Sequence, residues 1–130
     1  MTGTGVVAAE VERLLRPHVG ERLLVDEPLG ARTTYRVGGR AALLLEARSL
    51  DDLRAARDAV VATGVAVLVV GRGSNLLVAD AGFDGLAVVL GDDLAGIDVD
   101  GAVVRAGGSA SLPVVARRSV AAGLTGFEWA

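Results

Sequence analysis

The most constraining feature of the sequence is an uninterrupted apolar run that leads directly into a glycine-rich turn. The run covers residues 65–70, and Gly71-Arg72-Gly73-Ser74-Asn75 follows it without a spacer. A continuous apolar segment of this length, bounded by glycines, predicts a strand that is buried on both faces of a sheet. We therefore expect the glycine loop to lie where a buried strand ends.

The glycine loop has the composition of an anion-binding nest. Glycines at positions 71 and 73 allow successive backbone N–H groups to converge on a phosphate, because no Cβ blocks the approach. Ser74 and Asn75 add short hydrogen-bonding side chains, and Arg72 can neutralise one charge. A plain turn between two strands is the competing interpretation of these five residues.

The loop departs from the dinucleotide-binding fingerprint of Rossmann folds. Leu76 stands where a third glycine is required, and the strand-like residues 76–78 follow in place of a helix. Without a helix N-terminus, a pyrophosphate would depend on amides and side chains of the loop itself. The Rossmann interpretation therefore fails on context, whereas phosphate binding stays open.

Helix and strand patterns on either side of the loop predict an α/β first half and a β-rich second half. Helices are indicated by apolar residues at helical spacing with capping residues, and strands by alternation or short apolar runs between turn residues. The expected elements are a first helix ended by Pro17, a hairpin of residues 33–37 and 41–46 joined at Gly38-Gly39, a helix capped by Ser49 and ended by Gly64, the strand 65–70, strands at 76–78 and 86–90, a hairpin of residues 97–99 and 102–106 joined at Asp100-Gly101, and a last helix capped by Ser109 or Ser111.

Composition restricts the possible functions. The 130 residues are 52% hydrophobic, which is enough for one sizeable core. Thirteen basic and sixteen acidic residues give a net charge of -3 without long runs of either sign, so neither nucleic acid nor an anionic membrane is an expected partner. All basic residues are arginine and cysteine is absent, which excludes a Walker A lysine, disulfides and thiolate metal sites.

Other polar groups have plainer explanations than a functional site. Charges at Glu10, Glu12 and Arg13 interrupt the apolar start, so we expect no signal sequence or membrane span and a cytoplasmic location. The acidic residues at 92–93 and 98–100 lack the spacing of a known cation loop and are expected to be solvated. The pair Arg117-Arg118 is expected on the polar face of the last helix.

Six segments, taken in order, resemble the UDP-N-acetylenolpyruvoylglucosamine reductases, also called UDP-N-acetylmuramate dehydrogenases. This family consists of flavoproteins of peptidoglycan precursor synthesis. Each segment alone is a weak signal, but their order and spacing extend over nearly the whole chain. The segments are Thr33-Thr34-Tyr35-Arg36-Val37-Gly38-Gly39, Ser49-Leu50-Asp51-Asp52-Leu53, residues 67–78, Gly82-Phe83-Asp84-Gly85, Ala106-Gly107-Gly108 and Gly123-Leu124-Thr125-Gly126-Phe127-Glu128.

The resemblance implies an α+β FAD-binding fold of the vanillyl-alcohol oxidase and p-cresol methylhydroxylase type. Such a fold has two α/β subdomains with the flavin between them; here residues 20–70, approximately, would form the first and residues 71–130 the start of the second, without the substrate domain. The cofactor-binding residues implied are Gly71, Arg72, Gly73, Ser74 and Asn75 at the pyrophosphate, with Gly107 and Gly108 on the flavin side. No catalytic residue of the family falls within this chain.

The resemblance also implies a reaction. In the family NADPH reduces FAD, which then reduces the enolpyruvyl group of a UDP-sugar, so this chain alone is expected to be inactive. We expect an exposed apolar surface near the last helix and residues 127–129, with self-association through that truncated face. Two alternatives are another FAD-linked oxidase or dehydrogenase of the same fold, and a non-catalytic nucleotide-binding remnant.

Overall fold

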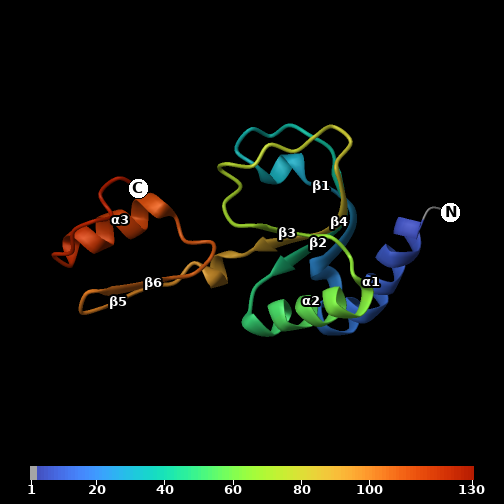
Figure 1. The fold of residues 1–130 in the computed structure, drawn as a ribbon, viewed down its shortest axis with the longest axis horizontal. Coiled ribbons are helices and arrows are strands. Elements are labelled where there is room, and N and C mark those ends of the chain that lie inside the picture. Colours follow the sequence, from blue (N-terminus) through green and yellow to red (C-terminus); the bar gives the residue numbers. More distant parts are fainter. Residues whose placement is uncertain (1–2) are drawn as a thin grey trace.

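A computed structural model describes residues 3–130 as two units that lie end to end (Figure 1). The first unit is a four-stranded sheet with two helices, and the second is a β-hairpin covered by one helix. The helices are α1 (Gly3–Val19), α2 (Leu50–Thr63) and α3 (Leu112–Ala121), with short 3₁₀ turns η1 (Gly20–Arg22), η2 (Gly30–Arg32) and η3 (Asp92–Leu94). The strands are β1 (Leu23–Pro28), β2 (Arg40–Ala47), β3 (Val67–Val70), β4 (Phe83–Leu90), β5 (Ile97–Asp100) and β6 (Val103–Ala106).

The larger sheet has the strand order β1-β2-β4-β3, in which β2, β4 and β3 are parallel and β1 is antiparallel. β4 lies inside this sheet, although it follows residue 70, where the sequence predicted the boundary between subdomains. Leu86, Ala87 and Val88 are buried there, so this apolar run needs a strand on each side. The two units divide near Gly91, after β4 ends.

The partner of β2 differs from the sequence-based expectation. β1 pairs with β2 in the register Leu24↔Leu44, whereas residues 33–37 form turns and loop. Thr33 explains the difference: its hydroxyl donates to the Gly30 carbonyl at 2.8 Å and accepts from the Arg36 N–H at 3.3 Å. These local bonds compete with a strand ladder, so the predicted hairpin does not form.

β3 ends at the expected glycine loop but is not buried on both faces. It is an edge strand of the described sheet, and Val67 and Val69 are 47% and 61% exposed. Residues 76–78, expected as a strand, have no ladder partner, although Val78 is buried. Apolar composition alone therefore did not separate a central strand from an edge strand or a packed loop.

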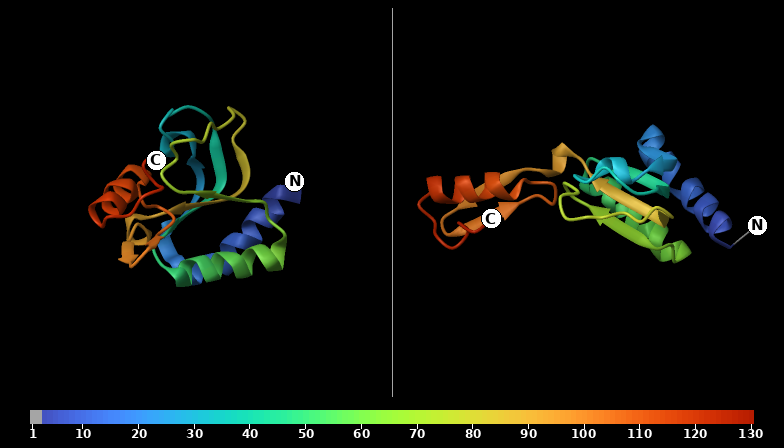
Figure 2. Two further views of the ribbon diagram at one scale, coloured as in Figure 1. Left: turned by 60° about the vertical axis from the view of Figure 1, so that its left-hand side comes forward. Right: turned by 90° about the horizontal axis from the view of Figure 1, so that it is seen from above.

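One face of the larger sheet is covered by α1 and α2 (Figure 2). Val11 and Leu15 of α1 pack with inward residues of β2 and β4, among them Leu43 and Leu86. α1 continues through Pro17 to Val19, contrary to the expected end at proline. A proline in the last turn removes few helical hydrogen bonds, and the Arg16 guanidinium donates to the carbonyls of Gly20 and Leu23, both at 3.2 Å.

The second helix confirms its predicted caps. The Ser49 hydroxyl accepts a hydrogen bond from the Asp52 N–H at 3.1 Å, and Gly64, with φ of 69°, ends α2 in the left-handed conformation. The Asp52 carboxylate also accepts from the Arg48 N–H at 2.8 Å and pairs with Arg22. Both ends of α2 were therefore predictable from neighbouring residues.

The opposite face of the sheet is covered by a loop layer, made of residues 29–39 and 71–82. Leu29 and Val78 from this layer pack on Leu44 and Ala87 of the sheet. The two loops touch closely at Gly38, where φ is 108° and an added Cβ would lie 2.2 Å from the Val78 carbonyl oxygen. The loop layer therefore takes the place that a third helix would have in a doubly covered sheet.

The smaller unit consists of the β5–β6 hairpin and α3, at one end of the molecule (Figure 1). The predicted hairpin is confirmed with its turn shifted by one residue, because Asp100 still pairs with Val103. α3 begins after Ser111, whose side chain makes no cap bond; the hydroxyl of Ser109 donates instead to the Gly91 carbonyl at 2.6 Å. Among the described residues, no helix is long and apolar enough to cross a membrane.

Candidate functional site

The carboxyl ends of β2, β4 and β3 meet at one edge of the larger sheet. The register aligns them, since Ala47 pairs with Leu90 and Val70 with Val89. The glycine loop leaves this edge from β3, and the connection to the smaller unit leaves it from β4. Ligands of open sheets with parallel strands bind at this carboxyl edge, so the topology places the glycine loop in a ligand-binding position.

The shape of the loop is fixed by contact with the segment after η2. Gly73 has φ of 67°, and an added Cβ would lie 2.5 Å from the Arg32 carbonyl oxygen. Its own carbonyl accepts a hydrogen bond from the Thr34 N–H at 3.1 Å. The segment from Arg32 to Thr34 therefore forms a wall against which the glycine loop is folded, and Gly73 is the residue that permits the close approach.

The backbone donors of the loop are its second feature that bears on ligand binding. In the part of the chain that the structure describes, the N–H groups of residues 71–75 donate to no other backbone group. Arg72, Ser74 and Asn75 are exposed beside them. A run of such donors next to an arginine and two short polar side chains is suited to an anion. The loop thus fits a phosphate or pyrophosphate.

Of the second group of predicted residues, the structure brings Gly108 to the glycine loop and packs Gly107 against the residues after η3. An added Cβ on Gly71 would lie 2.9 Å from the Gly108 carbonyl oxygen. An added Cβ on Gly107 would lie 1.8 Å from the Leu94 carbonyl oxygen, and the Gly107 N–H donates to the Gly96 carbonyl at 2.8 Å. Segments distant in the sequence therefore meet through glycine backbone at the junction of the two units.

The arginine of the loop is only weakly held. Arg72 lies 3.4 Å from the Asp92 carboxylate at the start of η3, and the two side chains are 53% and 96% exposed. Exposed pairs at this distance contribute little stability, so Arg72 is free to turn toward an anion. Asp98 and Asp100 each lie 3.7 Å from Arg105, and both side chains are exposed. These carboxylates are therefore solvated, as expected from the sequence.

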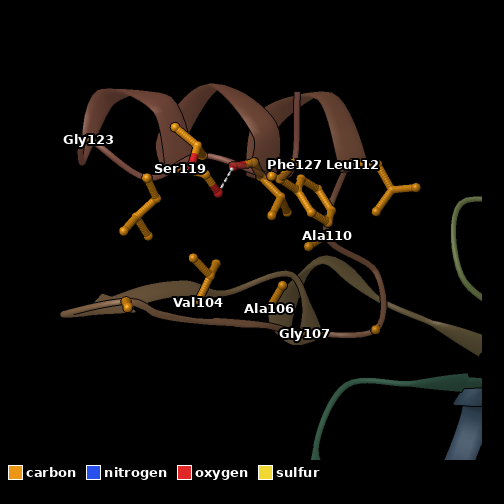
Figure 3. A pocket seen from close by; sticks show the side chains of 14 residues that line it. Val104, Ala106, Gly107, Ala110, Leu112, Ser119, Gly123 and Phe127 are labelled. Atoms are coloured by element: carbon orange, nitrogen blue, oxygen red, sulfur yellow. Dashed lines mark hydrogen bonds between the residues drawn. The ribbon is translucent and has the colours of Figure 1, made fainter. Parts of the chain in front are cut away.

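A cavity of about 720 Å³ lies between the hairpin and α3 (Figure 3). Its lining is largely apolar and includes Val104, Leu112 and Phe127, with Gly107 and Gly108 along one side. The Ser119 hydroxyl in its wall donates to the Val115 carbonyl at 2.8 Å, as the dashed line in Figure 3 shows. The cavity therefore offers apolar contact next to the polar glycine loop.

One ion pair of the larger unit shifts the pKa values of both its partners. The Asp52 carboxylate is buried, and the hydrogen bond from the Arg22 guanidinium lowers its pKa, against the opposing effect of burial. The same bond raises the pKa of Arg22. Because this pair ties η1 to the start of α2, its role is structural.

The sequence did not indicate the wall formed by the segment from Arg32 to Thr34. Thr34 and Arg32 contact the glycine loop through backbone atoms, which any residue type provides, so composition gives no signal for them. Ser109 was considered only as a helix cap, yet it holds the connection between the two units. Residues 33–39 form one of the six segments that resemble the family, and this was the one indication in the sequence that they lie near the site.

Residues 41–130, which include the glycine loop and both Gly107 and Gly108, match the model of a family described as FAD binding domain. The chain belongs to this family. The FAD binding domain match confirms the expected cofactor class and the mixed α and β content of the fold.

Curated relatives agree with the resemblance seen in the sequence. The chain is 43% identical over 117 residues to a UDP-N-acetylenolpyruvoylglucosamine reductase of Paramagnetospirillum magneticum, covering 90% of this chain and 38% of the relative. It is 39% identical over 129 residues to the enzyme of that name from Parvibaculum lavamentivorans, covering 99% and 41%. The protein of the same name from Bacillus subtilis is 36% identical over 120 residues, covering 92% and 39%. This FAD binding domain thus spans about two fifths of the length of these relatives, and the resemblance is confirmed.

Proposed function

We propose that this chain is the FAD-binding part of an NADPH-dependent reductase that converts UDP-N-acetylglucosamine enolpyruvate to UDP-N-acetylmuramate. The observation on which the proposal depends is the glycine loop at the carboxyl edge of three parallel strands, in a chain of the FAD binding domain family; within residues 3–130 the N–H groups of this loop donate to no other backbone group. The names of the relatives supply the substrate class. A role in peptidoglycan precursor synthesis and a cytoplasmic location belong to the same proposal.

In this proposal residues 71–75 hold the FAD pyrophosphate. The backbone N–H groups donate to its oxygens, Ser74 and Asn75 add side-chain donors, and Arg72 exchanges its weak contact with Asp92 for a phosphate charge. We assign the flavin side of the cofactor to Gly107 and Gly108, which line the apolar cavity next to the loop. We assign the fold to the vanillyl-alcohol oxidase type, with its two subdomains meeting near Gly91.

The chemistry divides between cofactor and protein. Bound FAD supplies hydride transfer, which no amino-acid side chain provides. The residues of this chain bind and orient it: the glycine loop fixes the pyrophosphate, and the wall at Thr34 fixes the loop. We assign substrate orientation and protonation to the remaining length that the relatives possess, so this chain alone should not reduce the UDP-sugar with NADPH.

An FAD titration of the purified chain, followed by flavin fluorescence, tests the proposal. We expect saturable binding that Asn75→Ala weakens about tenfold, the usual effect of losing one hydrogen bond to a charged group. Arg72→Gln should weaken binding similarly and reduce its dependence on salt. Arg57→Gln is the matched control, because Arg57 lies on α2, away from the loop, and pairs with the neighbouring Asp58. Equal effects of the two arginine substitutions, or no FAD binding by a folded chain, would contradict the proposed site.

A further inference from the structure

The chain that continues from the wall runs beside the glycine loop in the same direction (Figure 1). The Thr34 N–H donates to the Gly73 carbonyl at 3.1 Å, and the Gly39 N–H donates to the Ala79 carbonyl at 2.9 Å. The stretch between these two hydrogen bonds is fixed at both ends, and Arg36 lies within it. Two peptide units place the Cα of Arg36 within about 7.6 Å of the Cα of Thr34, a distance that an arginine side chain can cover. Arg36 is therefore within reach of the glycine loop.

Arg36 has a backbone conformation that suits glycine. Its φ is 53°, in the left-handed region that residues with a Cβ rarely adopt. Thr33 holds this conformation, because its carbonyl and its hydroxyl both accept the Arg36 N–H at 3.3 Å. Glycine would serve the turn alone better, since it adopts this φ without strain. Strained residues of this kind gather at ligand sites, where the side chain has a use that offsets the strain.

The charge of Arg36 is not used by an ion pair among the described residues, in contrast to the arginines on either side of it. The Arg32 guanidinium lies 2.9 Å from the Glu46 carboxylate, and the Arg40 guanidinium lies 3.1 Å from the Asp26 carboxylate. Arg36, between them in the sequence, is exposed and takes part in no such pair within residues 3–130. Its positive charge is therefore available to a bound anion.

We propose that Arg36 is a second anion-binding residue of the candidate site and neutralises the second charge of the FAD pyrophosphate. This inference rests on the proposed function, which assigns the pyrophosphate to residues 71–75. A pyrophosphate that joins two nucleotides carries two negative charges, whereas the loop itself contains one arginine, Arg72. Because the chain has a net charge of -3, a second cation beside the loop raises its affinity for such a ligand. A guanidinium can also donate two parallel hydrogen bonds to phosphate oxygens.

Replacement of Arg36 by glycine separates a binding role from a structural one. Arg36→Gly removes the backbone strain, so the urea midpoint should rise or stay unchanged, while the FAD dissociation constant should increase about tenfold. A residue that merely supports the fold would lower both stability and affinity when replaced. Asp26→Gly is the matched control, because Asp26 has φ of 50° on β1 and this variant should leave FAD affinity unchanged.

The charge itself is tested by FAD titrations at several salt concentrations. Arg36→Gln should weaken FAD binding about tenfold and reduce its dependence on salt, and Arg36→Lys, which keeps the charge, should recover most of the affinity. Arg40→Gln removes the same charge at a residue that pairs with Asp26, so it should not change FAD affinity. FAD binding that Asn75→Ala weakens and Arg36→Gln leaves unchanged would overturn this inference and retain the proposed function.

Inorganic pyrophosphate is a second probe, which keeps the two proposals distinguishable. At constant ionic strength it should shift the NMR amide signals of residues 71–75, and its affinity should be lower for Arg36→Gln than for the wild type. Such binding without any binding of FAD would support the role of Arg36 and contradict the proposed function. Pyrophosphate binding that Arg36→Gln does not weaken overturns the inference. A folded chain whose signals respond to neither pyrophosphate nor FAD overturns it as well.

Discussion

The carbonyl oxygen of Gly73 accepts a 3.1 Å hydrogen bond from the backbone N–H of Thr34, which joins the glycine loop to the turn after η2. The same contact leaves no space for a side chain at Gly73, since an added Cβ would approach the Arg32 carbonyl oxygen to 2.5 Å. The loop therefore depends on this neighbouring segment for its shape, and a defect on either side should reach the cofactor.

Gly73→Ala should therefore reduce both stability and FAD affinity, and Gly64→Ala provides a control with nearly the same φ. The two glycines have φ of 67° and 69°, but an added Cβ on Gly64 meets no atom within 4 Å. Both variants place an alanine in the left-handed backbone region, which lowers the free energy of unfolding by about 1 kcal/mol. Gly73→Ala should lose about 1–3 kcal/mol more through the clash with backbone. Urea denaturation measures the difference, and equal losses would show that the wall does not confine Gly73.

The junction of the two units can be tested at Gly107. A Cβ at Gly107 would lie 1.8 Å from the Leu94 carbonyl oxygen, whereas one at Gly96 meets nothing within 4 Å. Gly107→Ala should move the hairpin relative to η3 and lower the unfolding midpoint, while Gly96→Ala should be nearly neutral. Thermal unfolding by circular dichroism compares the two. A neutral Gly107→Ala would mean that the hairpin adjusts to the side chain without cost.

The Arg22–Asp52 pair predicts how stability depends on acid. The hydrogen bond from Arg22 lowers the pKa of Asp52 in the folded state, so its stabilising effect is complete above the unfolded pKa of about 4. That effect is lost as pH falls through the lowered folded pKa. Asp52→Asn should be about 1–3 kcal/mol less stable at neutral pH and should lose less stability in acid.

Urea titrations at a series of pH values measure this dependence. Asp51→Asn is the control, since Asp51 is on the same turn but its side chain is 88% exposed. The two variants should show different slopes of unfolding free energy below about pH 4. Parallel curves for Asp52→Asn and the wild type would show that the pair does not contribute to acid sensitivity.

The hydrogen bond of Ser109 should stabilise the connection between the two units. Its buried hydroxyl donates to the Gly91 carbonyl at 2.6 Å, across the connection between β4 and the hairpin. Ser119 is also buried but donates to Val115 within α3 at 2.8 Å. Ser109→Ala should cost about 1 kcal/mol and speed amide exchange near Gly91, whereas Ser119→Ala should affect α3 alone. Hydrogen exchange followed by mass spectrometry separates these patterns.

Elements specified by local residues were predictable, and those specified by distant partners were not. The caps of α2 at Ser49 and Gly64 and the β5–β6 hairpin depend on nearby residues, and the structure confirms them. The pairing of β1 with β2 and the central position of β4 depend on contacts between distant segments. Apolar runs at 65–70 and 86–90 look alike in sequence, yet the first is an edge and the second is buried.

The candidate site shows the same division. The glycine loop and its position after β3 follow from the sequence, because glycines and a strand end have local signatures. Its meeting with Gly108 and its wall at Thr34 arise from backbone contacts between separate segments. Residue type does not encode such contacts, so only the folded arrangement reveals them.

The insertion of β4 between β2 and β3 also sets the order in which the chain can fold. β1 and β2 are close in sequence and can pair early, but β3 has no neighbour until the residues of β4 have been made. Parallel pairing of β2 with β4 closes a long stretch of chain, which is a slow kind of contact to form. During synthesis on the ribosome the sheet therefore stays incomplete until residue 90 has emerged, and the glycine loop takes its final shape only after that point.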